Sequence, residues 1–171
     1  HAAPTTLMCV DKVQRRFLRE MGVTEAQALA DWNLAPLPCR RAIAMLGLLY
    51  RIAMKQAPAP LCELFRRFDG VRPGHTTTRG FGRRHPLQLC EATTMGGHTE
   101  VFRRSLFGLV TVWNMVPEAV VLSGSIRTFQ KGLQDAVRNR ALETDDFAGF
   151  FVDAMRMTVQ KFQTYFSESR G

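Results

Sequence analysis

This chain of 171 residues lacks several features that would assign it to a broad class at once. No window approaches the roughly 18 consecutive uncharged apolar residues that a membrane-spanning helix needs. The N-terminus, "HAAPTTLMCV", lacks the basic-then-apolar order of a secretion signal. It also lacks an initiating methionine, which fits a piece cut from a longer protein. We therefore expect no membrane partner.

Cysteine and histidine are scarce and scattered. The four cysteines stand singly, with no C-x-x-C pair, and His75 and His85 belong to a polar stretch that does not cluster further ligands. Structural zinc sites need tight Cys and His spacing. We expect no metal, no cofactor, and reduced thiols in an intracellular protein, nuclear or cytoplasmic.

A nucleophile with a base and an orienting partner is also missing. Ser105, Ser123 and Ser125 do not stand in a nucleophile-elbow context, and the local sequence suggests no Cys/His pair. We therefore predict that the chain by itself is not an enzyme.

What the chain does have is positive charge: 23 Lys and Arg against 15 Asp and Glu, a net charge of +8. The excess is concentrated in residues 66–104, which hold eight arginines and three acids. Such an excess favours polyanionic partners, although a merely soluble basic domain shows it too. Residues 66–85 are rich in Arg and Gly with neither helical nor strand period, which predicts a basic flexible loop.

Helical periodicity dominates the N-terminal part. Residues 10–21 place five apolar side chains on one face and four cations on the other, with Gly22 as the stop: Val10, Val13, Phe17, Leu18 and Met21 against Lys12, Arg15, Arg16 and Arg19. Thr24 and Gln27 match a capping box for a short helix ending near Trp32. From Pro38, an almost wholly apolar stretch predicts the central, most buried helix.

The C-terminal half predicts further helices. One follows Ser125, with Ile126, Phe129, Leu133 and Val137 on its apolar face, and a long one runs from Asp145 to Phe166, capped by Thr144. Residues 106–116 fit a buried helix that stops before Pro117, with a strand as the alternative.

A short β-hairpin is the other element that this half allows. Leu87 to Cys90 and Val101 to Arg104 would pair around Gly96-Gly97. The expected fold is therefore mainly α: a single helical domain over residues 1–171, with six or seven helices, the long basic loop, and room for this hairpin.

Two blocks resemble the region that follows the polymerase core in non-LTR (LINE-like) retrotransposon reverse transcriptases. The first is "DKVQRRFLREMGVTEAQALADWNLAPLPCRRAIAMLGLLYRIAMKQAPAPLCELF"; the second is "RRSLFGLVTVWNMVPEAVVLSGSIRTFQKGL". The second is similar to the family's closing signature at Arg104, Ser105, Trp113, Asn114, Pro117, Ser125, Phe129 and Lys131. Together the blocks cover about two thirds of the chain in the family's order.

The chain also departs from this family. Gly108 and Leu109 stand where the family usually has Pro-Arg, which removes a cation. A polymerase palm needs carboxylates that hold two metal ions about 4 Å apart. The only Asp-Asp pair, Asp145-Asp146, follows Glu143 at the position of the expected aromatic residue and fits a helix start better.

We therefore expect a non-catalytic, nucleic-acid-binding C-terminal portion of a LINE-like reverse transcriptase, or a degenerate remnant of one. RNA and/or DNA would be bound without sequence preference, and an upstream polymerase domain of the same polypeptide is a second expected partner. The alternative is a helical protein–protein interaction module without nucleic-acid binding. The predicted phosphate-binding residues are Arg15, Arg16, Arg40, Arg41, Arg66, Arg67, Arg72, Arg79, Arg83, Arg84, Arg103 and Arg104.

For most of these residues a structural interpretation competes with the functional one. A solvated helix face accounts for Arg15, Arg16, Arg40 and Arg41 as well as a cationic strip does. Trp32 and Trp113 lie among apolar residues, which favours core packing over stacking on bases.

Overall fold

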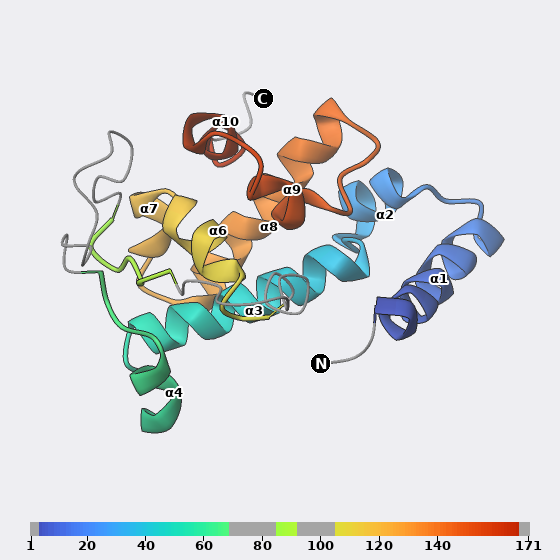
Figure 1. The fold of residues 1–171 in the computed structure, drawn as a ribbon. Helices are drawn as coiled ribbons and strands as arrows, with labels where there is room; N and C mark the ends of the chain where they lie inside the picture. Colours follow the sequence, from blue (N-terminus) through green and yellow to red (C-terminus); the bar gives the residue numbers. More distant parts are fainter. Residues whose placement is uncertain (1–3, 69–84, 92–104, 168–171) are drawn as a thin grey trace. The chain divides into compact units, whose positions relative to one another are not determined.

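The computed structural model describes residues 4–68, 85–91 and 105–167 (Figure 1). These ranges contain nine helices, and their only β-structure is a single antiparallel bridge between Arg67 and Leu89. The mainly α fold class is thereby confirmed. The helix count exceeds the predicted six or seven because several helices span only one or two turns. No described helix is long and apolar enough to cross a membrane.

The chain divides into two compact units. Unit 1 combines residues 1–44 with residues 130–171, and unit 2 comprises residues 45–129. The divisions fall within two long helices, α3 (Leu37–Ala53) and α8 (Ile126–Glu143). A single domain over the whole chain stays a prediction.

Unit 1 begins with α1 (Pro4–Glu20) and α2 (Glu25–Trp32). The predicted capping box is present: the Thr24 hydroxyl accepts from the Gln27 amide N–H at 3.1 Å, and the Gln27 side chain accepts from the Thr24 amide N–H at 2.9 Å. Gly22 follows α1 with a φ of +69°, a left-handed conformation that glycine adopts without steric cost. The stop of α1 near Gly22 and the capped start of α2 are therefore confirmed, whereas α1 begins at Pro4, six residues before the predicted Val10.

The apolar side of α1 differs from expectation. Of the five apolar residues assigned to its inner face only Leu18 is buried, and the other four are exposed. The helix is held instead by polar contacts: the Gln14 side chain accepts from the Leu37 amide at 2.9 Å and donates to the Ala35 carbonyl at 3.2 Å. The helical periodicity correctly placed these apolar residues together along the helix, but it could not tell which face of α1 the rest of the chain covers.

The long helix predicted for Asp145–Phe166 is wrong. Two short helices replace it, α9 (Phe150–Ala154) and α10 (Val159–Thr164), and both lie near α8 (Figure 1). The Thr144 hydroxyl accepts from the Asp146 amide in a local turn, whereas Thr158 caps α10 by accepting from the Lys161 amide. The second cap restarts the helix, and the break lets Phe150 contact Phe162, with ring centroids 5.4 Å apart.

Cys39 lies in the core of unit 1. Its thiol donates to the carbonyls of Phe147 and Ala148 at 3.4 and 3.3 Å. Burial raises the pKa of this thiol to about 12, so the group stays protonated. All four cysteines are free thiols, as predicted.

Unit 2 contains α4 (Ala59–Leu64), α6 (Leu109–Met115) and α7 (Glu118–Val121). The helical interpretation of residues 106–116 is confirmed, with Pro117 directly after the last turn. Trp113 is fully buried, 5.6 Å from the Phe129 ring, and Phe129 stacks on Tyr50 at 4.9 Å. Trp113 is therefore a core residue, as predicted.

Residues 85–91 cross unit 2 without regular structure and are tied to α6 by side chains. The Trp113 indole donates to the Leu87 carbonyl at 2.9 Å. Asn114 bonds Leu89 twice, accepting from its amide at 3.0 Å and donating to its carbonyl at 2.9 Å. Of the segment Leu87–Cys90, only Leu89 forms a bridge; the hairpin partner Val101–Arg104 lies outside the described residues.

Candidate nucleic-acid interface

The structure describes six of the twelve arginines predicted to bind phosphate. Four belong to unit 1 and two to unit 2: Arg15, Arg16, Arg40 and Arg41, then Arg66 and Arg67. The other six lie outside the described residues, as does most of the predicted basic loop: Arg72, Arg79, Arg83, Arg84, Arg103 and Arg104.

The cations of α1 lie on an exposed outer face. Arg16 donates to Glu20 one turn later, at 2.8 Å, and Arg15 lies 4.0 Å from Glu25. Both arginine side chains are more than half exposed, so these pairs are screened by solvent and contribute little to stability. The guanidinium groups remain open to an incoming phosphate.

Arg41 has a different environment. Its guanidinium donates to both carboxylate oxygens of Asp11, at 2.6 and 3.0 Å, and thereby joins α3 to α1. The Asp11 side chain is only 12% exposed, so this bidentate pair is better shielded than the pairs on the α1 surface. Because the carboxylate balances its charge, we leave Arg41 out of the proposed interface.

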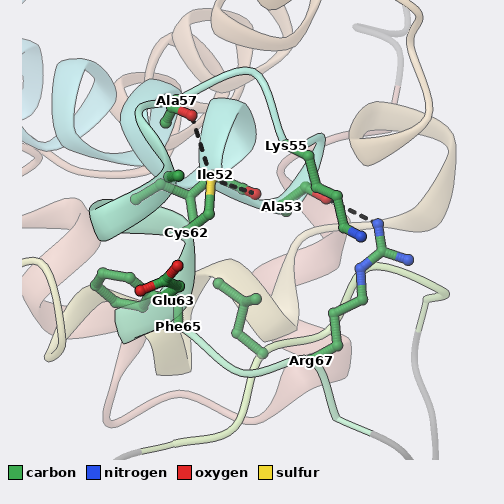
Figure 2. Close-up of a pocket in the computed structure, with 10 residues that line it drawn as sticks. Ile52, Ala53, Lys55, Ala57, Cys62, Glu63, Phe65 and Arg67 are labelled. Carbon is green, nitrogen blue, oxygen red and sulfur yellow. Dashed lines mark hydrogen bonds between the residues drawn. The ribbon is translucent and has the colours of Figure 1, made fainter.

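Arg67 lines a pocket of about 410 Å³ in unit 2, at the C-terminal end of α3 (Figure 2). Its guanidinium donates to the Ala53 carbonyl at 2.8 Å, and the Cys62 thiol donates to the Ile52 carbonyl at 3.8 Å. The last carbonyls of a helix lack intrahelical partners and carry partial negative charge. Arg67 and Cys62 therefore complete the end of α3, while Arg66 stays exposed beside them.

Arg40 belongs to a polar groove of about 520 Å³ in unit 1, where α3 faces α8. Arg40 and Ala44 line one wall, one helical turn apart, and Gln130 and Gln134 line the other at the same spacing. The remaining lining residues are Asn33, Ile43, Lys131 and Asp135.

The charges of this groove favour an anion. Arg40 and Lys131 are both exposed, and neither forms an ion pair within the described ranges. The one carboxylate of the groove, Asp135, lies 3.8 Å from the Arg138 guanidinium, which offsets its charge. Two unpaired cations among amide side chains form the donor set that proteins use for phosphate and sugar contacts.

Trp32 stands immediately before Asn33, whose side chain accepts from Gln134 at 3.1 Å at the groove. The prediction that Trp32 packs in the core is wrong, because 54% of its surface is exposed. The reason is its place at the last residue of α2: Asn33 follows in the left-handed conformation and ends the helix. Exposed aromatic side chains combined with cations are typical of single-strand binding surfaces.

Sequence reasoning missed most of this groove. Lys131 entered only through the family resemblance, and Asn33, Gln130 and Gln134 were not considered. The available signal was their spacing: Gln130 and Gln134 lie one turn apart along one edge of the apolar face of α8, and Lys131 lies farther round toward solvent. The contribution of Asn33 and Arg40 depends on tertiary packing.

A search of the described residues finds no group of three His, Cys, Asp or Glu side chains that could hold a metal ion. No family model, no curated protein and no solved structure matches the chain.

Proposed function

We propose that this chain binds single-stranded RNA or DNA, as a non-catalytic C-terminal portion of a LINE-like reverse transcriptase or a remnant of one. The observation that carries the proposal is the groove of unit 1, which Arg40 and Lys131 line without ion-pair partners among the described residues, and whose lining residue Asn33 directly follows the exposed Trp32 in the sequence. Two sequence blocks similar to that family, and a net charge of +8, support it.

The mechanism combines two general interactions. Arg40 and Lys131 would neutralise phosphates and release condensed counterions, which makes affinity fall as salt rises. Trp32 would stack on an unpaired base, a contact available to every base. The Gln130 amide would donate to phosphate or sugar oxygens and fix the register of the strand, while Gln134 already donates to Asn33 and holds that side of the groove. Because none of these contacts depends on a base edge, binding would be sequence-tolerant.

Fluorescence anisotropy with labelled 20-nucleotide RNA and DNA tests the proposal. The double variant Arg40→Gln, Lys131→Gln should weaken binding. It should also reduce the magnitude of the slope of log affinity against log salt concentration by about two, one for each lost phosphate contact. Trp32→Ala should cost about 1–3 kcal/mol at every salt concentration. Arg156→Gln is the matched control, since Arg156 is an exposed cation of unit 1 that does not line the groove.

Two results would contradict the proposal that this groove binds nucleic acid. One is the absence of binding at low salt; the other is an affinity that Arg40→Gln, Lys131→Gln and Arg156→Gln all reduce equally. A separate variant that neutralises Arg79, Arg83 and Arg84 measures the contribution of the predicted basic loop, independently of the groove.

A second candidate function is that of a helical protein-interaction module. The exposed apolar side chains of α1 favour it, because soluble proteins seldom leave such a row uncovered without a partner.

A further inference from the structure

The pocket at the C-terminal end of α3, which we call the α3-end pocket, has the size of a small-molecule site. Its volume of about 410 Å³ falls within the range of about 300–1,000 Å³ that such sites occupy. Every lining residue belongs to unit 2. The walls are chiefly apolar and include Ile52, Ala53, Ala57, Phe65 and Leu89. All of these except Ala57 are buried, so the pocket offers a fixed apolar surface that hydrocarbon could cover.

Two cations line the same pocket, Lys55 and Arg67. Figure 2 shows their charged ends on one side of it, whereas the Glu63 carboxylate lies on the other side. The Arg67 guanidinium has five N–H donors, and its bond to the Ala53 carbonyl uses one of them. Neither Lys55 nor Glu63 forms an ion pair within the described ranges. One side of the pocket therefore offers positive charge and hydrogen-bond donors to a ligand.

The backbone of Lys55 is in a conformation that favours glycine. Its φ is +56°, and its amide donates to the Ile52 carbonyl at 3.0 Å while the Gln56 amide donates to the Arg51 carbonyl at 2.7 Å. This is the Schellman arrangement, whose left-handed position usually holds glycine because a side chain there costs conformational free energy. With these amides and Arg67 bonded to the last carbonyls of α3, the helix end does not need the Lys55 ammonium. Strained residues of this kind cluster at ligand-binding positions.

The chemistry of the pocket selects an amphipathic anion. A hydrocarbon chain would displace water from the apolar walls, and a carboxylate would accept charge-assisted hydrogen bonds from Lys55 and Arg67. Glu63 would repel a carboxylate from the other side and so orient the ligand. An amphipathic cation would instead meet two cations for one carboxylate.

We propose that the α3-end pocket binds a small monocarboxylate with an apolar chain. This inference goes beyond nucleic-acid binding and is independent of the groove of unit 1. Lys55 and Arg67 would hold the carboxylate, and the buried walls would hold the chain.

Isothermal titration calorimetry of the whole chain with octanoate, hexanoate and octylamine tests the ligand class. Octanoate should bind with a Kd below about 1 mM. Hexanoate should bind about tenfold more weakly, because it buries two fewer methylene groups. Octylamine should bind at least about tenfold more weakly than octanoate, because its charge has the wrong sign for Lys55 and Arg67.

The Cys62 thiol reports whether the ligand occupies this pocket. Cys62 lines the pocket and is half-buried, whereas Cys9 is an exposed thiol of unit 1. At about ten times its Kd, octanoate should slow the alkylation of Cys62 by iodoacetamide about tenfold. The alkylation of Cys9, read by peptide mass spectrometry in the same sample, should not change.

The variant Lys55→Gly separates binding from stability. Glycine adopts the left-handed conformation without steric cost, so the melting temperature should not fall, while octanoate binding should weaken about five- to tenfold. Arg156→Gln is the matched control, because it removes an exposed cation of unit 1 and should leave the affinity for octanoate unchanged. Glu63→Gln alters the pocket itself and should leave this affinity unchanged or raise it.

Three outcomes would overturn the proposal. The first is octanoate that does not bind below about 1 mM. The second is equal affinity for octanoate and octylamine, since the cations would then select nothing. The third is octanoate binding that neither protects Cys62 nor weakens in Lys55→Gly, which would place the bound carboxylate elsewhere on the chain.

Discussion

Trp113 and Asn114 are neighbours in the sequence with different structural tasks. The indole fills the core of unit 2, while the Asn114 amide meets both backbone groups of Leu89. Residues 85–91 form no helix and only one bridge, so their buried N–H and C=O groups need partners from side chains. This requirement gives the Trp-Asn pair a structural reason that does not depend on nucleic acid.

The first prediction concerns Asn114. Asn114→Ala should lower the free energy of unfolding by about 2–4 kcal/mol, because it leaves the N–H and C=O of Leu89 without these bonds in a buried site. Urea unfolding followed by the fluorescence of buried Trp113 measures the loss. Gln160→Ala, at an exposed position of α10, should change stability by less than about 0.5 kcal/mol. Equal effects of the two variants would show that the Asn114 bonds contribute nothing specific.

Among the helices, the predictions that depend on residues close in sequence were correct, and those that depend on tertiary packing were not. The capping box of α2, the stop of α1 at Gly22 and the buried face of α8 depend on neighbours within one or two turns, and all three are confirmed. The exposed apolar side of α1 and the break between α9 and α10 depend on which surfaces the rest of the chain covers. The same limit applies to the groove, where Arg40 and Lys131 are 91 residues apart in sequence.

A second prediction concerns the junction between α8 and α10. Glu143 accepts from the Tyr165 hydroxyl at 2.7 Å and from Lys161 at 3.1 Å. The bond from Tyr165, and then that from Lys161, lowers the pKa of Glu143; bonds to Tyr165 and to Glu143 raise the pKa of Lys161. A carboxyl whose pKa is lowered by folding stabilises the folded state at every pH above its unfolded-state pKa, and this stabilisation is lost as the pH falls through the folded-state pKa. An amine whose pKa is raised by folding stabilises the folded state at every pH below its unfolded-state pKa, and this stabilisation is lost as the pH rises through the folded-state pKa.

The junction should therefore stabilise the chain most between about pH 6 and pH 9. Glu143→Gln should lower the melting temperature in this window, and its difference from the unaltered chain should shrink below pH 4.5, the ordinary pKa of this carboxyl. Asp31→Asn is the control, because Asp31 is an exposed acid of α2 that forms no ion pair within the described ranges. A difference that stays constant from pH 4 to pH 9 would contradict the role of the ionised carboxylate.

At the scale of the whole molecule, each of the two compact units has its own aromatic core. Phe150, Phe162 and Tyr165 meet in unit 1, and Tyr50, Trp113 and Phe129 meet in unit 2. Because most stabilisation comes from burial within a core, damage to one core should first loosen the helices that pack on it. The helices α3 and α8 contribute residues to both units, so hydrogen exchange along them reports where that loosening stops.

The third prediction follows from this division. Phe150→Ala should cost about 3–5 kcal/mol, since Phe150 is fully buried, and should reduce amide protection in α9, α10 and the second half of α8. Leu49→Ala, at a fully buried position of unit 2, should instead reduce protection in α6 and residues 85–91. Native-state hydrogen exchange with mass spectrometry distinguishes the two patterns. If both variants lower protection equally along the whole chain, the two units open together, and the single cooperative domain expected from the sequence is the better description of this protein.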